Sequence, residues 1–298
     1  MAFTASDVKE LREMTGCGMM DCKKALTETD GDKDKAVELL REKGLATAAK
    51  KSGRIASEGI VKSHIDGGVG VVVEVNSETD FVAKNADFQD FVADVAKTVA
   101  VAAPADVEAL KATECNGTTV GDILTEKIAK IGENMNIRRF VRIETTGAVV
   151  DYIHAAGKIG VLVEADAEDN DATRECLKNV AMQVAALNPK YLSSADIPDD
   201  YKEHEKNILI AQLQNDPKNA NKPANIIEKM IEGRLAKEFK EVCLLEQEYV
   251  KAENKESVGK YIASVGNITI NQFARFETGE GLEKKVDDFA AEVASMVK

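Results

Sequence analysis

The sequence predicts an α+β fold built from two related halves, preceded by a helical unit and interrupted late by a helical hairpin. Three observations support this prediction. Apolar strand patterns come in two sets, each with a long amphipathic helical pattern, and short glycine-containing turns join the first two strands of each set. The sets also resemble each other in sequence. Because tight turns pair neighbouring strands antiparallel, we expect two small sheets with helices on one face of each.

The internal repeat contains one local difference. The stretch 70–76 recurs ninety positions later as 160–166, whereas the helical pattern that follows recurs at an offset of eighty-five. The first copy therefore has five more residues between strand and helix. These extra residues include Thr79, Asp80, Phe81 and Val82. Because binding residues are commonly displayed on loops held by a rigid scaffold, this connection is the first candidate for function.

The length of 298 residues favours two or three folding units. We expect five segments. They are a three-helix unit at 1–54, the first half of a core at 55–146, its second half at 147–198 and 247–278, a helical hairpin at 199–246, and a C-terminal helical module at 279–298.

The N-terminal unit shows three short helical patterns. The first begins after a cap at Thr4, and glycines at 16 and 18 separate it from the second. A turn at 30–32 precedes the third, which we expect to end at Gly44 as a C-cap. The basic stretch 48–54 then reads as a connector to the core.

Each half of the core shows the same order of elements. In the first half we expect strands at 59–64 and 69–75, a helix at 87–101, a second helical pair ending near 134, and a closing strand at 137–144. In the second half we expect strands at 148–154 and 159–165, a helix at 172–186, and a closing strand at 268–277.

Two further helical segments follow from periodicity. Helices at 199–213 and 223–245 flank a breaker-rich stretch, with Pro223 in the first turn of the second helix. An apolar stripe on that second helix packs on its mate, on the core or on another chain. The stripe is Ile226, Ile227, Met230, Ile231 and Leu235. A terminal amphipathic helix at 282–297 follows two glycines and docks on this chain or on a partner.

Composition and missing motifs exclude several classes of function. The net charge of −13 repels phosphate backbones, so we expect no direct nucleic-acid binding. No apolar run is long enough for a membrane span, and the absence of a signal or transit pattern predicts a cytoplasmic protein. The scattered cysteines and histidines predict no metal site. No phosphate-binding loop or nucleophile motif appears, which predicts no cofactor, no catalytic residue and no enzyme activity.

Three ordered motifs resemble bacterial translation elongation factor Ts, and the likeness runs from Met1 to the helix at Phe289. The motifs are residues 14–26, residues 76–84 and residues 130–139. The resemblance implies a guanine-nucleotide exchange factor that binds GDP-bound elongation factor Tu, disturbs its Mg²⁺ and phosphate site, and promotes GDP release. It also implies that the three-helix unit is ubiquitin-associated-like, and that the hairpin serves a homodimer or 2:2 assembly.

The resemblance assigns roles to particular residues. Thr79, Asp80, Phe81 and Val82 match the family's T-D-F-V loop, which enters the GTPase near its magnesium site. Arg12, Met19 and Met20 match the N-terminal contact with the partner's nucleotide domain. His154 begins a segment that departs from the family's H-x-G-G-R-I-G, with Ala156 and Lys158 in place of glycine and arginine. Residues 105–119 have no counterpart in shorter members and read as a surface elaboration.

Plainer alternatives stand beside these roles. From spacing alone, Phe81 could cap the helix that starts near Asp87, and Asp80 could be an ordinary turn residue. The methionines could fill a core. Two adjacent methionines cannot both face inward on one helix, so at least one is expected on the surface. His154 could be purely structural. Two rival functions are a ubiquitin-like-modifier binder, which leaves the large core unexplained, and a small-molecule enzyme, for which the sequence offers no catalytic group.

Overall fold

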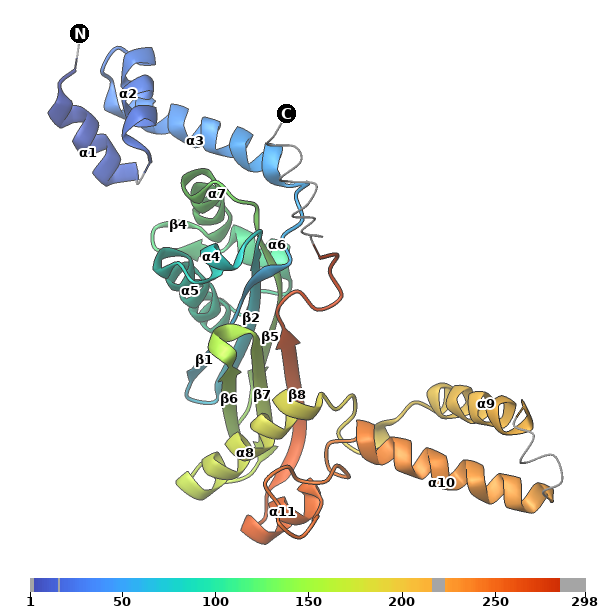
Figure 1. Ribbon diagram of the computed structural model, residues 1–298. Coiled ribbons are helices and arrows are strands. Elements are labelled where there is room, and N and C mark those ends of the chain that lie inside the picture. The colour runs from blue at the N-terminus through green and yellow to red at the C-terminus, as the bar shows by residue number, and fades with distance from the viewer. Residues whose placement is uncertain (1–2, 16, 216–222, 285–298) are drawn as a thin grey trace.

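The computed structural model describes residues 3–15, 17–215 and 223–284 (Figure 1). Its core contains two three-stranded antiparallel sheets, in the orders β1-β2-β5 and β6-β7-β8, each with helices on its outer face. The predicted α+β class, with N-terminal helices and small antiparallel sheets, is confirmed. Most of the predicted C-terminal helix lies outside the described residues.

The two halves share details of backbone geometry as well as order. The strands are β1 (Glu58–Asp66), β2 (Val69–Ser77) and β5 (Met135–Glu144), against β6 (Ala148–His154), β7 (Ile159–Asp166) and β8 (Thr269–Glu277). A β-bulge follows Glu74 in one sheet and Glu164 in the other. The long helices α5 (Ala86–Ala102) and α8 (Asp171–Leu187) are each capped by an asparagine side chain at the N-terminus and end in a left-handed residue.

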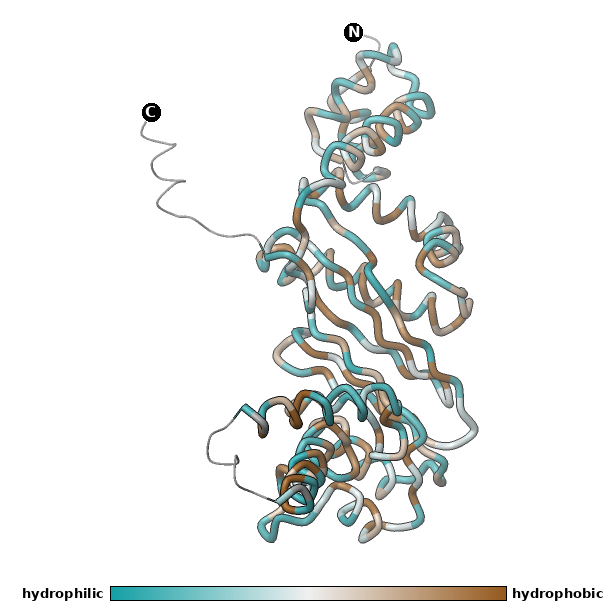
Figure 2. The backbone as a smooth tube through the Cα atoms, turned by 90° about the vertical axis from the view of Figure 1, so that its right-hand side faces the viewer, coloured by the Kyte–Doolittle hydropathy of each residue, from teal (hydrophilic) through white to brown (hydrophobic). Residues whose placement is uncertain are grey.

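The sheets pack against each other as well as against helices. Val71, Val73 and Val75 of β2 belong to the cluster beneath α5. Alternate residues on the opposite face form a separate cluster between the sheets, consisting of Val61, Val72, Ile143, Leu162 and Phe276. Both central strands are therefore buried on both faces. In Figure 2 the hydrophobic colour runs along these strands accordingly. The sequence prediction did not include this sheet-to-sheet contact.

The N-terminal unit contains α1 (Ala5–Thr15), α2 (Met19–Glu28) and α3 (Lys33–Lys51) around its own small apolar cluster. The prediction that Gly44 ends the third helix is wrong, because α3 continues through it to Lys51. Gly44 is buried where α3 contacts α7 (Val120–Ile131), and an added Cβ would lie 3.6 Å from the Ala129 side chain. The glycine thus permits close helix packing.

Residues 105–119 are not a surface elaboration, and that prediction is wrong. They form α6 (Val107–Ala112) and a small hairpin of β3 (Glu114–Cys115) with β4 (Thr118–Thr119). Leu110 is completely buried and Cys115 is buried, and both belong to the cluster beneath α5. The segment is therefore part of the core of the first half.

The inserted hairpin consists of α9 (Asp199–Asn215) and α10 (Ala224–Val242), which project away from the sheets in Figure 1. The two helices contact each other, with Leu213 and Ile231 buried and Ile226 exposed. Pro223 is the N-cap and not a first-turn residue. A further helix, α11 (Val258–Val265), lies against α8 and was not predicted.

Candidate partner-binding surface

The extra connection of the first half forms a single helical turn, α4 (Asp80–Ala83). We call residues 79–84 the α4 turn. Val82 is 7% exposed and Ala83 is also buried, so both side chains anchor the turn in the core beneath α5. The ring of Phe81 faces the other way and is 80% exposed. A large apolar side chain is therefore held on the surface by a turn whose other side is buried.

Phe81 does not cap the helix that follows. The side chain of Asn85 performs that role, because its Oδ1 accepts hydrogen bonds from the Asp87 and Phe88 amides at 2.8 and 3.4 Å. The plainer structural interpretation of Phe81 is thereby excluded, and its exposure has no explanation within the described chain.

Asp80 places a carboxylate beside Phe81. Its Oδ2 accepts a hydrogen bond from Lys84 Nζ at 2.6 Å, and this bond lowers the pKa of Asp80 below its ordinary value. At neutral pH the group is therefore an ionised, solvent-accessible acceptor. An exposed ion pair of this kind contributes little to stability, so Asp80 is available for other contacts.

Thr79 faces the protein rather than the solvent. It is the N-cap of α4, and its Oγ1 accepts a hydrogen bond from the Val82 amide at 3.4 Å. Its own amide and hydroxyl donate to the carboxylate of Glu133, which lies in the turn between α7 and β5. Of the four residues in the T-D-F-V segment, Asp80 and Phe81 thus face outward, while Thr79 and Val82 hold the turn in place.

The N-terminal methionines are on the surface. Met19 is 49% exposed and Met20 is 64% exposed at the start of α2, and Met14 at the end of α1 is also exposed. The core of this unit is made by other residues, among them Leu11 and Leu26. Arg12 is exposed on α1. Neither methionine therefore fills the core of this unit.

His154 is exposed at the end of β6, where its Nδ1 lies 3.0 Å from the Tyr152 hydroxyl. The following short helix η1 (Ala155–Gly157) contacts β1, as the α4 turn does. After the hydrogen bond from Lys84, the charge of Lys158 also lowers the pKa of Asp80. Both short helices thus contact the same strand, β1, which their sequence separation did not reveal.

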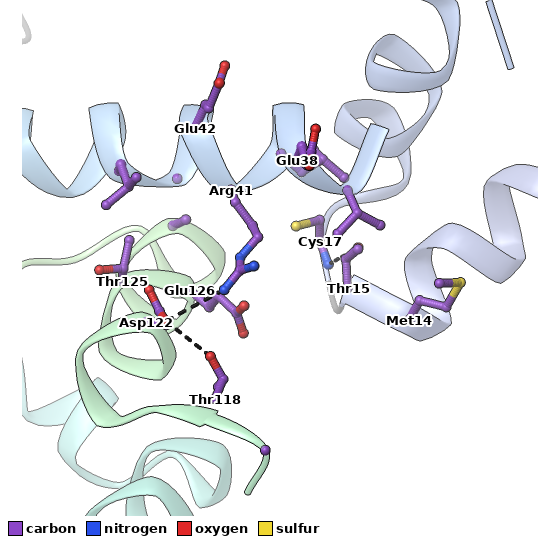
Figure 3. Close-up of a pocket in the computed structure, with 16 residues that line it drawn as sticks. Met14, Thr15, Cys17, Glu38, Arg41, Glu42, Thr118, Asp122, Thr125 and Glu126 are labelled. Atoms are coloured by element: carbon purple, nitrogen blue, oxygen red, sulfur yellow. Dashed lines mark hydrogen bonds and ion pairs between the residues drawn. The ribbon is translucent and has the colours of Figure 1, made fainter. Parts of the chain in front are cut away.

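A cleft of about 730 Å³ separates the N-terminal unit from the first half of the core. Figure 3 shows Arg41 of α3 pointing across it to Asp122 of α7, with 3.5 Å between Nη2 and Oδ2. Met14 and Cys17 line one side. None of the site residues predicted from the sequence lines this cleft. No sequence signal could have revealed it, because it depends on how α3 crosses α7.

Metal-binding and membrane-spanning features are both absent from the described residues. No group of three or more His, Cys, Asp or Glu side chains in residues 3–15, 17–215 and 223–284 is arranged to hold a metal ion. Over the same ranges, none of the helices has the length and apolar character needed to cross a membrane.

Comparisons with known proteins cover nearly the whole chain. The family model described as elongation factor TS matches residues 78–280, which include the α4 turn and His154 but not Arg12, Met19 or Met20. The elongation factor Ts of Clostridioides difficile (strain 630) is 51% identical over 99% of this chain and 99% of the relative. That of Syntrophotalea carbinolica is 50% identical over the full length of both chains. That of Halothermothrix orenii is 50% identical over 100% of this chain and 99% of the relative. The chain belongs to the elongation factor Ts family.

Proposed function

We propose that this chain promotes GDP release from elongation factor Tu by placing Asp80 and Phe81 of the α4 turn against the GTPase's magnesium and phosphate site. As a member of the elongation factor Ts family, the chain is a nucleotide exchange factor for elongation factor Tu and not an enzyme. The observation that carries the proposal is the 80% exposure of Phe81 on a turn that Val82 anchors in the core.

The two outward side chains have different roles in this proposal. A GTPase holds GDP through phosphate contacts and a bridging Mg²⁺, so displacing that neighbourhood weakens nucleotide binding. Phe81 wedges into apolar packing of the partner, and Asp80 brings a negative charge to a site whose balance depends on the cation. Neither residue makes or breaks a covalent bond. Since coupling free energy is symmetric, tight factor binding and tight GDP binding weaken each other equally.

Other parts of the chain extend the contact. We propose that Arg12, Met19 and Met20 dock the N-terminal unit, taken as residues 1–54, on the nucleotide domain of the partner. His154 adds a polar contact from the end of β6, within a core of residues 55–146, 147–198 and 247–278. The hairpin, 199–246, supports a homodimer or 2:2 assembly, and 279–298 forms a terminal docking module. The family assignment supports a cytoplasmic location.

The test is release of fluorescent GDP from purified elongation factor Tu, with and without this chain. We expect Phe81→Ala to weaken productive binding by more than ~1 kcal/mol, as truncating a large anchor in an interface commonly does. Asp80→Ala should slow GDP release more than it weakens complex formation. Both variants should melt within the equivalent of ~0.5 kcal/mol of wild type, since both side chains are exposed surface positions.

Phe88→Ala is the matched control for stability. Phe88 of α5 is completely buried, and losing a buried phenylalanine costs about 3–5 kcal/mol. The double variant Asp80→Ala, Phe81→Ala should show non-additive losses, because neighbouring residues couple. Undiminished exchange by a folded double variant would overturn the proposal. Calorimetry should also detect no GDP binding to the isolated chain.

A further inference from the structure

The turn between α7 and β5, residues 132–134, holds the α4 turn from the protein side. The Thr79 amide donates to Glu133 Oε2 at 3.0 Å, and the Thr79 hydroxyl donates to Oε1 at 2.7 Å. Both oxygens of one carboxylate thus serve one residue. Hydrogen bonds to an ionised acceptor are about twice as strong as neutral ones, so this contact has a defined geometry.

A second, reciprocal bond crosses the same junction. Glu78 Oε1 accepts from the Asn134 amide at 2.6 Å. Residues 78 and 79 are therefore paired crosswise with residues 134 and 133, although the two segments are far apart in sequence. We call these contacts the 78/133 clamp.

The clamp acts on the direction in which Phe81 points. An isolated helical turn has almost no stability of its own, and α4 contains only 4 residues. The Val82 amide donates a hydrogen bond to Thr79 Oγ1, and Glu133 fixes that oxygen by accepting a hydrogen bond from the Thr79 hydroxyl. Thr79 is held at one end of the turn and Val82 is buried in its middle. The ring of Phe81 is therefore directed to the solvent.

The same turn also holds the end of the N-terminal unit. The Gly132 carbonyl accepts a hydrogen bond from Lys51 Nζ, and Asn134 Nδ2 donates to the Arg54 carbonyl at 2.7 Å. The connector from α3 and the α4 turn are thus fastened to one three-residue turn, and both lead to residues proposed to contact the partner.

We propose that Glu133 is a positioning residue for nucleotide exchange, which acts through Thr79 to aim Phe81 and Asp80 at the partner. This inference rests on the proposed function of the α4 turn. Glutamine at position 133 keeps the shape of the side chain but offers one acceptor oxygen and an amide donor. A threonine hydroxyl can accept as well as donate, so the glutamine amide can still contact Thr79, but neither bond then has a charged acceptor.

The experiment compares Glu133→Gln with the matched surface control Glu114→Gln, which removes one charge from an exposed residue of the same half. At saturating factor, Glu133→Gln should slow GDP release about tenfold, because both bonds to Thr79 lose their charged acceptor and neutral hydrogen bonds are about half as strong. The affinity of the complex should change less, and the control should behave as wild type. Thr79→Ser keeps the hydroxyl and should retain exchange.

Hydrogen–deuterium exchange of the free chain supplies a readout that needs no partner. Peptides covering residues 79–85 should exchange faster in Glu133→Gln than in wild type, while peptides from α8 stay unchanged. Slower GDP release without faster deuterium exchange would overturn the inference, because Glu133 would then act on the partner directly. If Glu133→Gln fails to fold, Thr79→Val removes the hydroxyl from the other side. Normal GDP release by Thr79→Val would also overturn the inference.

Failure of the inference and failure of the proposed function give different results. If the Phe81→Ala variant promotes GDP release as fast as wild type, the function proposed for the α4 turn is overturned, whatever Glu133→Gln shows. If Phe81→Ala is slow and Glu133→Gln is as fast as wild type, only the positioning role is overturned. Slow GDP release with both variants, each with a normal melting temperature, supports the proposed function and the positioning role alike.

Discussion

Three successive residues at the end of β6 have left-handed backbone conformations. Ala155 has φ of 48°, Ala156 has φ of 54° and Gly157 has φ of 97°. Gly157 also approaches β1 closely, since an added Cβ would lie 3.1 Å from Ile60 Cβ. Glycine adopts this region freely, but a residue with a side chain is disfavoured by about 1–2 kcal/mol. The two alanines are therefore strained beside the exposed His154.

Ala156→Gly should stabilise the protein. Relief of about 1–2 kcal/mol of strain exceeds the ~0.4–1 kcal/mol that glycine costs through the unfolded chain. We expect the free energy of unfolding to rise by roughly 0.5–1 kcal/mol, measured by urea denaturation. Ala46→Gly, at an exposed position inside α3, is the control and should lower it by about 1 kcal/mol. Equal destabilisation by both variants would show that position 156 is not strained.

At the scale of single residues, the sequence limited the candidates without deciding their orientation. The offset in the repeat marked Thr79–Val82, but it could not tell which side chain faces out. The orientation depends on which side chain packs in the core, and that side chain is Val82. Similarly, one exposed methionine was required by helix geometry, and both Met19 and Met20 proved to be exposed.

Buried carboxylates occupy equivalent positions in the two central strands. Glu74 in β2 pairs with Arg138 at 3.0 Å and Arg139 at 2.6 Å, and it accepts the Gly279 amide at 2.8 Å. Glu164 in β7 accepts from neutral groups instead, namely Thr145, Asn271 and Gln272. In the first sheet the carboxylate therefore also fastens the end of β8 to β2.

Glu74→Gln should be much more destabilising than Glu164→Gln. Removing one partner of a buried ion pair costs about 3 kcal/mol, whereas loss of bonds from neutral groups costs nearer 1 kcal/mol. The urea midpoints of both variants at pH 7 check this expectation. Equal losses would mean that the arginines add nothing to the role of Glu74.

The pH dependence gives a second measurement on Glu74. Burial alone raises its pKa, but hydrogen bonds from the Gly279 amide, Asn76 and Arg139 outweigh burial and lower it. The contribution of Glu74 to stability is therefore present above the ordinary carboxyl pKa and is lost as the pH falls through the lowered pKa. Wild type should lose stability in this acid range more steeply than Glu74→Gln. Parallel curves would contradict this assignment.

Most elements lie within a few residues of their predicted bounds because periodicity is a local property of the sequence. Gly44 and residues 105–119 are exceptions with one cause. A glycine after an apolar run usually ends a helix, but here α3 packs on α7 and continues. Leu110 likewise is buried by a tertiary contact. Such contacts join segments that are far apart in the sequence, so local sequence patterns do not predict them.

Removal of residues 1–54 tests how the N-terminal unit belongs to the whole molecule. The truncated chain should remain folded. Its melting temperature should fall, because Ala48 packs on the core cluster and Asn134 binds the connector. A loss of ~1–2 kcal/mol corresponds to about 3–6 °C for a domain of this size. Binding to elongation factor Tu should weaken markedly.

The control is the double variant Met19→Ala, Met20→Ala in the full chain. Both side chains are exposed, so it should weaken binding without the shift in melting temperature. Full affinity of the truncated chain would show that this unit has no docking role.

The packing of one sheet on the other was the main architectural feature missed from the sequence. The continuous run Val71-Val72-Val73 carried a signal, because a strand that is apolar at every position is typical of burial on both faces. Which surface covers the second face cannot be read from a strand alone. The cluster that contains Val72 and Leu162 depends on the arrangement of both halves.

The late position of β8 in the chain has a consequence for synthesis. Phe276 of β8 completes the apolar cluster between the sheets, yet the whole α9–α10 hairpin is translated between β7 and β8. A nascent chain that stops before β8 leaves an edge of β7 unpaired and the inner face of the first sheet incompletely covered. Domains generally fold from the N-terminus during translation. Neither half of this core, however, can finish folding until β8 has left the ribosome.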